Sequence, residues 1–308
     1  MKLQNKIIAG VLLTITAILD CFGQSYAVTV APAIPKSMQF AGQTIDLDRV
    51  DRYERMDREI ISFTFGQTNM LLTIKRANRY MPVIADILRA NDLPEDLAYL
   101  AAIESHYDNT AVSGAKAAGM WQFMPSTAKE YGLDVNDYVD ERLDYEKSTV
   151  AACKYFKRAY AKYKSWLSVA AAYNAGMSRI SKSLENQEVG DAVDLYLNKE
   201  TSRYIFRLLA MKLIVEQPSR YGYSIKANQL YQPLECETIE VSDSVESWVA
   251  WSKEHNVTYS ILREYNPWIK DMTLPNASHK IYKVKIPKES FFYRSKQSLK
   301  TYKESWTK

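Results

Sequence analysis

Apolar positions recur at helical spacing through most of the first two thirds of the chain. Residues 83, 84, 87 and 88, for example, are all apolar and fall on one helix face. The segments 148–163, 165–175 and 201–216 contain no Gly or Pro. Residues 46–222 therefore predict a mainly α domain. Its clearest helical patterns cover residues 46–89, 97–107, 148–163, 165–175 and 201–216.

The pattern changes after Gly222. Residues 238–241 and 281–286 alternate apolar and polar side chains, which is typical of half-buried strands. Residues 245–255 and 259–265 between them have helical spacing. The order strand, helix, helix, strand predicts a small α+β (βααβ) module at residues 236–288, which we expect to be separable from the helical domain.

The N-terminus has the pattern of a secretory signal peptide. Lys2 and Lys6 precede an apolar stretch at residues 7–19, which is too short to span a membrane comfortably. Cleavage after Gly23 or after Ala27 would give simple secretion. The alternative is lipidation of Cys21, which would anchor the protein to a membrane, but Asp20 occupies a position where that signal requires a small residue.

Five regions follow from these patterns. The region that follows the signal contains Pro32 and Pro35 and predicts an extended segment. The last residues are rich in Ser, Lys and Tyr and need not be ordered. The predicted organisation is signal peptide 1–27, extended lead-in 28–45, helical domain 46–225, βααβ module 236–288 and C-terminal tail 289–308.

Composition narrows the possible functions only slightly. The chain has 308 residues, of which 47% are hydrophobic and 25% charged, as in ordinary globular proteins. A formal charge of +4 is too small to indicate nucleic-acid binding. Without Cys21, only Cys153 and Cys236 remain, which is no disulfide framework. Three His and no clustered Cys argue against a metal site.

One helix carries a carboxylate on its apolar face. Leu97, Leu100, Ala101 and Glu104 fall at i, i+3, i+4 and i+7, and only the last of them is polar. Burial disfavours the charged form of a carboxyl group, so the pKa of Glu104 should rise toward the value that a general acid needs at neutral pH. A surface Glu near a helix end is the alternative.

Three further segments help to decide whether Glu104 is a general acid or a surface residue. Residues 111–125 include Gly-Met-Trp-Gln-Phe-Met-Pro, residues 171–176 read Ala-Ala-Tyr-Asn-Ala-Gly, and residues 200–204 read Glu-Thr-Ser-Arg-Tyr. With Glu104, they resemble the lysozyme-like lytic transglycosylases of bacterial envelopes (the SLT domain), and most of all the membrane-bound lytic murein transglycosylase D type. The resemblance extends from about residue 79 to 217.

The resemblance implies a fold of packed helices around a long groove, with Glu104 as the only catalytic carboxylate. The implied reaction cleaves peptidoglycan between N-acetylmuramic acid and N-acetylglucosamine and forms a 1,6-anhydro ring. Tyr173 is expected to place its hydroxyl near Glu104. The other residues implied to bind substrate are Ser113, Gln122, Met124, Asn174, Glu200 and Tyr204. The implied partners are peptidoglycan glycan strands and no nucleic acid, with no cofactor, a location in the periplasm or cell envelope, and a monomeric state.

For some residues we expect a structural rather than a catalytic role. We expect Trp121 and Phe123 to pack in the core and Gly119 to serve backbone geometry. The chain departs from the family pattern at three positions. Ser202 stands in place of an Arg, which comes one residue later, Phe206 in place of a Pro, and Ser165 in place of an Asp.

The C-terminal module resembles LysM, a small domain that binds glycans containing N-acetylglucosamine. Residues 239–245, 248–250, 265–267 and 286–287 carry this resemblance. The usual Gly-Asp-Thr turn is replaced by Ser-Asp-Ser at residues 242–244, which makes a turn with positive φ harder to form. The module is therefore either a glycan binder or a structural appendage.

Two alternatives to a lytic transglycosylase remain at this point. A hydrolytic muramidase is one, because goose-type lysozymes share the helical core. A non-catalytic peptidoglycan-binding protein is the other. The presence of Glu104, Gln122 and Tyr173 argues against the second alternative.

Overall fold

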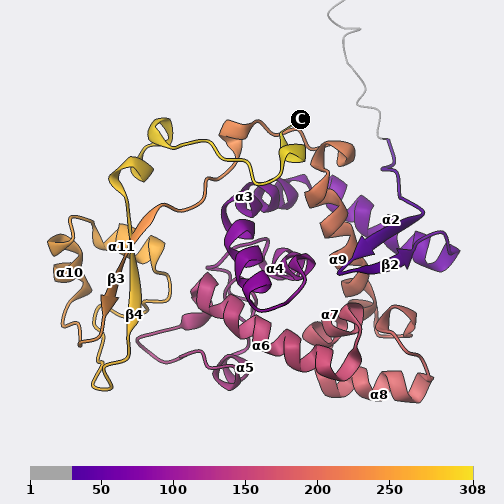
Figure 1. Cartoon of the computed structure of the whole chain (residues 1–308), viewed down its shortest axis with the longest axis horizontal. Helices are drawn as coiled ribbons and strands as arrows, with labels where there is room; N and C mark the ends of the chain where they lie inside the picture. Colours follow the sequence, from indigo (N-terminus) through magenta and orange to yellow (C-terminus); the bar gives the residue numbers. More distant parts are fainter. Residues whose placement is uncertain (1–29, 308) are drawn as a thin grey trace, which may run out of the picture. The chain divides into compact units, whose positions relative to one another are not determined.

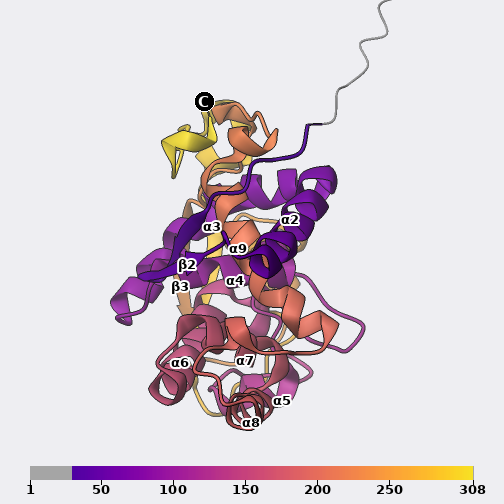
Figure 2. The ribbon, with the colours of Figure 1, turned by 90° about the vertical axis from the view of Figure 1, so that its right-hand side faces the viewer.

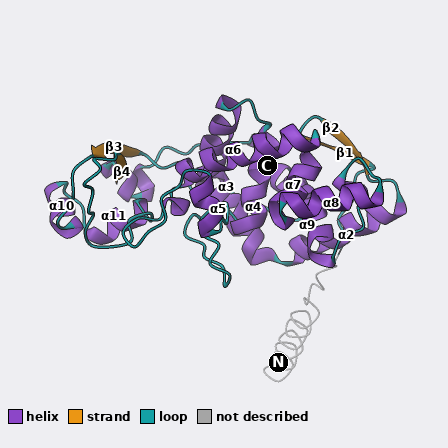
Figure 3. Cartoon of the chain, turned by 90° about the horizontal axis from the view of Figure 1, so that it is seen from below, coloured by secondary structure: helices purple, strands orange, loops and turns teal. Residues whose placement is uncertain are grey.

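The computed structural model describes residues 30–307, so the expected signal peptide, including Cys21, lies outside the described residues. The described chain is mostly helical, with a small C-terminal module that contains a two-stranded sheet, as predicted (Figures 1 and 3). The helices of the first domain are α2 (Val50–Phe65), α3 (Gln67–Ala90), α4 (Ala98–Ser105), α5 (Pro125–Glu130), α6 (Tyr145–Tyr163), α7 (Trp166–Ala175), α8 (Met177–Gln187) and α9 (Lys199–Glu216).

The short helix α4 lies in the middle of this domain and packs against α3 and α9 (Figure 1). Leu97, Leu100 and Ala101 are completely buried, which confirms the predicted apolar face. The helix ends earlier than predicted, because His106 and Tyr107 adopt left-handed backbone conformations with φ of 56° and 55°. The carboxylate is therefore carried by the last turn of the helix.

The lead-in expected at residues 28–45 contains a β-hairpin, made of β1 (Ser37–Phe40) and β2 (Gln43–Asp46) (Figure 2). Phe40 and Ile45 from these strands are buried in the core of the helical domain. The backbone N–H of Ala41, in the turn, donates to the Asp96 carboxylate at 2.6 Å. The segment is thus an integrated part of the helical domain rather than a simple lead-in.

The C-terminal module has the predicted βααβ order: β3 (Cys236–Val241), α10 (Trp248–Glu254), α11 (Tyr259–Tyr265) and β4 (Tyr282–Pro287). The strands β3 and β4 are antiparallel, with Ile239 opposite Val284. The turn at residues 242–244 contains no residue with positive φ, so it does not need the missing Gly. Asn276 braces this turn by donating a side-chain hydrogen bond to the Ser242 carbonyl at 2.8 Å.

A loop of the helical domain completes the module. Val139 is buried in the module's own hydrophobic cluster and forms an antiparallel bridge with Ile269. The next backbone N–H, of Asp140, donates to the Trp268 carbonyl at 2.9 Å. Lys280 of the module forms an ion pair with Asp134 of the loop at 2.6 Å. These contacts argue against the expectation that residues 236–288 are separable.

The C-terminal tail packs back onto the helical domain, so the expectation that it need not be ordered is wrong. Trp306 is completely enclosed in the core of that domain. The Asn78 side chain in α3 donates to the Lys300 carbonyl at 2.9 Å and accepts from the Tyr302 N–H at 2.8 Å. The Ser305 hydroxyl donates to the Glu216 carbonyl at the end of α9. The tail therefore links α3 to α9.

The described residues offer neither a membrane-spanning helix nor a cluster of metal-binding side chains. Between residues 30 and 307, no helix is both long and apolar enough to cross a membrane. The same residues contain no group of three or more His, Cys, Asp or Glu side chains that could hold a metal ion.

Candidate active site

Glu104 lies at the C-terminal end of α4 and faces α9. The Tyr204 hydroxyl, from α9, donates a hydrogen bond to Glu104 Oε1 at 2.5 Å. The pKa of Glu104 is raised from 4.5 to about 7, chiefly because the carboxyl group is buried and in smaller part because of the neighbouring negative charge of Glu200. The Tyr204 hydrogen bond and the positive charge of Arg207 oppose this rise. The predicted direction of the pKa change is confirmed.

A cavity of about 480 Å³ opens beside this carboxyl group. Asn174, Glu200 and Tyr204, which the sequence resemblance implies, line it together with Glu104. The sequence analysis missed three cations in its wall, Lys199, Arg203 and Arg207. They recur every four residues on α9, so their common helix face was readable from the sequence. The cavity therefore combines the carboxyl groups of Glu104 and Glu200 with a row of positive charges.

The departure at Ser202 has a structural explanation. Arg203, which follows it, donates two hydrogen bonds to the fully buried Glu59 of α2, at 2.8 and 3.0 Å. Ser202 faces away from this pair and accepts a hydrogen bond from Arg55 at 2.9 Å. Because α2 supplies Glu59, the Arg in its shifted position is still held firmly by a carboxylate at the edge of the cavity.

Burial and the nearby negative charge of Glu104 raise the pKa of the Tyr173 hydroxyl well above its usual value, so this hydroxyl lies near Glu104, as expected. Tyr173 makes no hydrogen bond to the Glu104 carboxyl group. Its hydroxyl donates instead to the Trp121 carbonyl at 2.7 Å. Its ring packs edge-on against Tyr155, with centroids 5.0 Å apart. The acid is positioned by Tyr204, while Tyr173 holds the backbone of the segment that precedes α5. The sequence alone does not indicate whether Tyr173 or Tyr204 hydrogen-bonds to the Glu104 carboxyl group, because both tyrosines lie on helices that are distant from Glu104 in the chain.

The remaining predicted residues lie on the segment 111–124, and the 480 Å³ cavity is not lined by them. The Ser113 hydroxyl accepts the Ala117 N–H at 3.0 Å, and the Gln122 side chain donates to the Gly119 carbonyl at 2.9 Å. Both side chains thus stabilise the loop itself. Met124, with 42% of its surface exposed, is open to contact a ligand.

Gly119 and Trp121 have the structural roles predicted for them. Gly119 has φ of 80°, and a Cβ at this position would lie 1.8 Å from the Arg142 carbonyl oxygen. Trp121 is fully buried and donates to the Thr149 hydroxyl at 2.8 Å. Phe123 is also buried. These residues fix the segment against α6 and the loop before it.

The other two departures from the family pattern are accommodated without distortion. Ser165 caps the N-terminus of α7 by accepting the Ser168 N–H, and its hydroxyl donates to Asp191 at 2.8 Å. Phe206 is completely buried in α9, and the Arg55 guanidinium lies 4.1 Å from the centre of its ring. The fold of the site is thus maintained by different side chains.

Comparison with known families agrees with this geometry. Residues 60–194 match the family model of the Transglycosylase SLT domain, and residues 237–290 match that of the Soluble lytic transglycosylase C-terminal LysM-like domain. The membrane-bound lytic murein transglycosylase D of Escherichia coli K12 is 33% identical over 219 residues, which cover 70% of this chain and 47% of that protein. The chain therefore spans about half the length of this relative.

Similar solved structures cover smaller parts of the chain. The 70 kDa soluble lytic transglycosylase from Escherichia coli has a TM-score of 0.38 and 22% identity, and covers 44% of this chain and 24% of that chain. An inactive mutant of the lytic transglycosylase Slt from Pseudomonas aeruginosa has a TM-score of 0.36 and 17% identity, over 46% of this chain and 24% of that chain.

The two family models match separate regions of the chain. The chain contains a lysozyme-like transglycosylase SLT domain at residues 60–194. This domain is followed by a LysM-like domain of the kind found at the C-terminus of soluble lytic transglycosylases. Both findings confirm the resemblance inferred from the sequence.

Proposed function

We propose that the protein is a peptidoglycan lytic transglycosylase. It cleaves the β-1,4 bond between N-acetylmuramic acid and N-acetylglucosamine and leaves a 1,6-anhydro-muramic acid end. One observation carries this proposal: a carboxyl group with a pKa of about 7, Glu104, faces a cavity within a transglycosylase SLT domain. At neutral pH this group is present in both protonation states, as an acid that later acts as a base requires.

The proposed mechanism uses Glu104 twice. Its proton passes to the glycosidic oxygen as the bond to C1 breaks, and the N-acetyl group of the muramic acid takes the place of an external nucleophile. The Glu104 carboxylate then accepts the proton of the C6 hydroxyl, whose oxygen closes onto C1 as the acetamido oxygen leaves C1. No water is consumed, and Glu104 ends as it began. Tyr204 keeps the carboxyl in place for both steps.

Substrate contacts are proposed in two groups. Asn174, Glu200 and Tyr204 line the cavity beside Glu104, and their polar groups are available to sugar hydroxyl and acetamido groups. The second group would extend the binding surface and consists of Ser113, Gln122 and Met124, on the segment before α5, and Tyr173, on α7. The cations on the face of α9 would favour a substrate that carries carboxylates.

We further propose that the protein is exported to the periplasm or cell envelope. The N-terminal sequence pattern and the substrate support this location, and lipidation at Cys21 would add a membrane anchor. The LysM-like module is proposed to bind glycan strands of the same polymer. Each of these proposals concerns where the enzyme meets its substrate rather than the chemistry at Glu104.

The hydrolytic muramidase remains the second candidate because of Glu200. Hydrolysis of a glycosidic bond ordinarily uses two carboxylates that flank it, and Glu200 is a second carboxylate in the same cavity. The transglycosylase needs only Glu104. The two candidates therefore differ in what they require of Glu200.

The test is mass spectrometry of the products released from purified peptidoglycan. We expect 1,6-anhydro ends from the wild-type protein, and anhydro ends still from Glu200→Gln. Reducing ends, heavier by one water, would identify a muramidase, especially if Glu200→Gln were as inactive as Glu104→Gln. Absence of any released product would favour the non-catalytic binding protein.

A further inference from the structure

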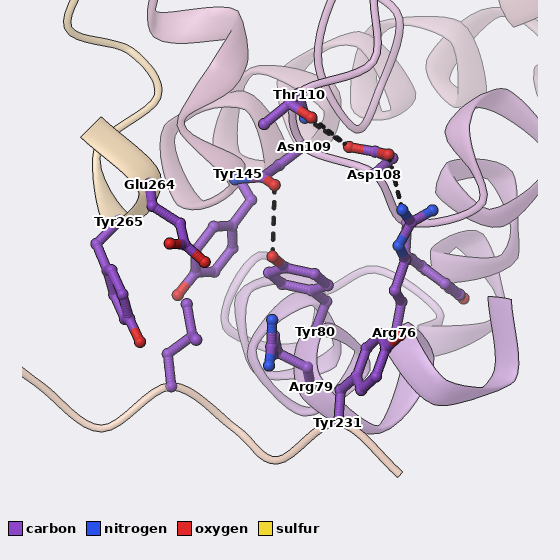
Figure 4. Close-up of a pocket in the computed structure, with 12 residues that line it drawn as sticks. Arg76, Arg79, Tyr80, Asp108, Asn109, Thr110, Tyr145, Tyr231, Glu264 and Tyr265 are labelled. Carbon is purple, nitrogen blue, oxygen red and sulfur yellow. Dashed lines mark hydrogen bonds and ion pairs between the residues drawn. The ribbon is translucent and has the colours of Figure 1, made fainter. Parts of the chain in front are cut away.

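A second cavity, of about 300 Å³, has no lining residue in common with the cavity beside Glu104. Figure 4 shows its walls. One wall comes from α3 and the loop after α4, a second from the segment that connects the domains, and a third from α11 of the LysM-like module. The lining residues used below are Arg76, Arg79, Tyr80, Asp108, Tyr145, Tyr231, Glu264 and Tyr265.

Five tyrosines line this cavity. Tyr80 and Tyr145 are buried and pack edge-on, with ring centroids 5.1 Å apart. Tyr231 and Tyr265 come from the connecting segment and from α11. The buried Tyr80 and Tyr145 rings therefore form a packed pair in the wall of this cavity.

Of the two arginines in the cavity, one is already neutralised. Arg76 donates to the Asp108 carboxylate at 2.9 Å, and that carboxylate also accepts from Thr110 (Figure 4). Arg79 is placed differently. Its Nε donates to the Gln232 carbonyl at 3.1 Å, and its guanidinium lies 5.3 Å from the centre of the Tyr231 ring. This arrangement directs the rest of the guanidinium toward the cavity, as Figure 4 shows.

A negative charge comes from a different wall. Glu264, on α11, is exposed and lines the cavity beside Tyr265. Burial raises the pKa of the Tyr265 hydroxyl to about 12, with Glu264 adding to the rise and Arg79 opposing it. The charges of Glu264 and Arg79 therefore both act on the Tyr265 hydroxyl. The cavity presents one cation and one anion, on separate elements, around an aromatic interior.

We infer that this cavity binds a free α-amino-acid group, in which one carbon carries both an ammonium and a carboxylate. Arg79 would hold the carboxylate, Glu264 the ammonium, and the Tyr80 and Tyr145 rings would contact the attached aliphatic chain. A neutral sugar offers neither charge, so it would form no ion pair with Arg79 or Glu264. The inference goes beyond the proposed function and does not depend on catalysis at Glu104.

Two sources could supply this group: a free amino acid, or a peptide attached to the glycan. Isothermal titration with the full chain carrying Glu104→Gln, which prevents turnover, separates them. The probes are free diaminopimelic acid, a disaccharide tripeptide that ends in diaminopimelic acid, the same tripeptide with its free amine acetylated, and an N-acetylglucosamine tetramer. Binding beside Glu104 would persist in variants of the second cavity and so appears as a separate event.

The decisive variant is Glu264→Gln, with Glu254→Gln as its matched control, because both are exposed Glu residues on helices of the same module. We expect Glu264→Gln, and likewise acetylation of the amine, to raise the Kd at least tenfold, and Glu254→Gln to leave it unchanged. Arg79→Met should weaken binding and Arg79→Lys should restore part of it. Circular dichroism melting checks that each variant is folded.

Tighter binding of the disaccharide tripeptide than of diaminopimelic acid would identify the glycan-attached peptide as the ligand, and equal binding would identify a free amino acid. A Kd that is unchanged by Glu264→Gln, or competition by the sugar tetramer at this site, would overturn the inference. Failure of the proposed function would appear independently, in the products of the wild-type enzyme.

Discussion

Opposing influences set the protonation of Glu104. Burial and Glu200 raise its pKa, whereas the Tyr204 hydrogen bond and Arg207 lower it, and the result is a pKa of about 7. A carboxyl group in an ordinary surface position would be almost fully ionised at neutral pH and could not donate a proton. Lytic activity should therefore decline as the pH rises above about 7, because the acid form of Glu104 is then lost.

Glu104→Gln should abolish turnover. General acid–base catalysis contributes about 10²- to 10⁴-fold, and we expect the loss at or beyond the upper end because the same group performs both proton transfers. The measurement is release of soluble muropeptides from peptidoglycan, with Glu254→Gln as the control. Near wild-type release by a folded Glu104→Gln protein would exclude Glu104 as the catalytic acid.

The same substitution should stabilise the protein at neutral and higher pH. The pKa of Glu104 is higher in the folded chain than its ordinary value of 4.5, so the folded state keeps a proton that the unfolded state loses. Stability therefore falls as the pH rises from about 4.5 to about 7, by at most ~3 kcal/mol. Glu104→Gln should remove this loss, which denaturant unfolding at pH 4 and pH 8 would detect. A fall in stability at pH 8 would contradict the expected result.

Tyr204→Phe should affect the acid more than Tyr173→Phe. It removes the hydrogen bond that lowers the pKa of Glu104, so the basic limb of the pH–rate profile should move to higher pH. Activity should also fall, because the carboxyl is held less firmly. Tyr173→Phe removes only the bond to the Trp121 carbonyl, so the limb should stay in place. The pH dependence of kcat/KM for both variants would distinguish these effects, and equal shifts would contradict this assignment.

At the scale of elements, helix α4 and its buried face were predictable because the 3.6-residue period is local in the sequence. Its contact with Tyr204 was not, since that contact depends on how α9 packs across the domain. The hairpin at residues 37–46 was missed because each strand has four residues, too few to show a period. Lys199, Arg203 and Arg207 show a readable period, but only the fold brings their face to the cavity.

The segment between α4 and α5 depends on Gly119. Its φ of 80° is unfavourable for other residues, and a Cβ would lie 1.8 Å from the Arg142 carbonyl oxygen. Gly119→Ala should therefore cost several kcal/mol, on the order of the ~4 kcal/mol that marks exceptionally damaging substitutions. Urea unfolding would measure it. Gly114→Ala is the matched control, because a Cβ there meets no atom within 4 Å and should change stability little. Equal stability of the two variants would contradict this account.

At the scale of the whole molecule, the C-terminal tail contributes to the stability of the catalytic domain. Trp306→Ala should reduce the free energy of unfolding by about 3–5 kcal/mol, because it empties a fully buried site in the helical core. Leu299→Ala, at a tail position that is 56% exposed, should change it by less than about 0.5 kcal/mol. Thermal and denaturant unfolding would compare them, and a Trp306→Ala protein as stable as wild type would mean that the tail is dispensable.

The packing of Val139 in the core of the LysM-like module affects how this module could be transferred between enzymes, in evolution or by engineering. The LysM-like module takes one of its core side chains from the catalytic domain, so its structural boundary is discontinuous in sequence. If residues 236–288 were grafted onto another enzyme, the core of the module would contain a cavity at the position of the Val139 side chain. The same loop continues into Arg142, whose guanidinium donates to the Phe123 carbonyl beside the active-site segment. The transplantable unit therefore includes residues 134–140, and recombination at the linker alone should be poorly tolerated.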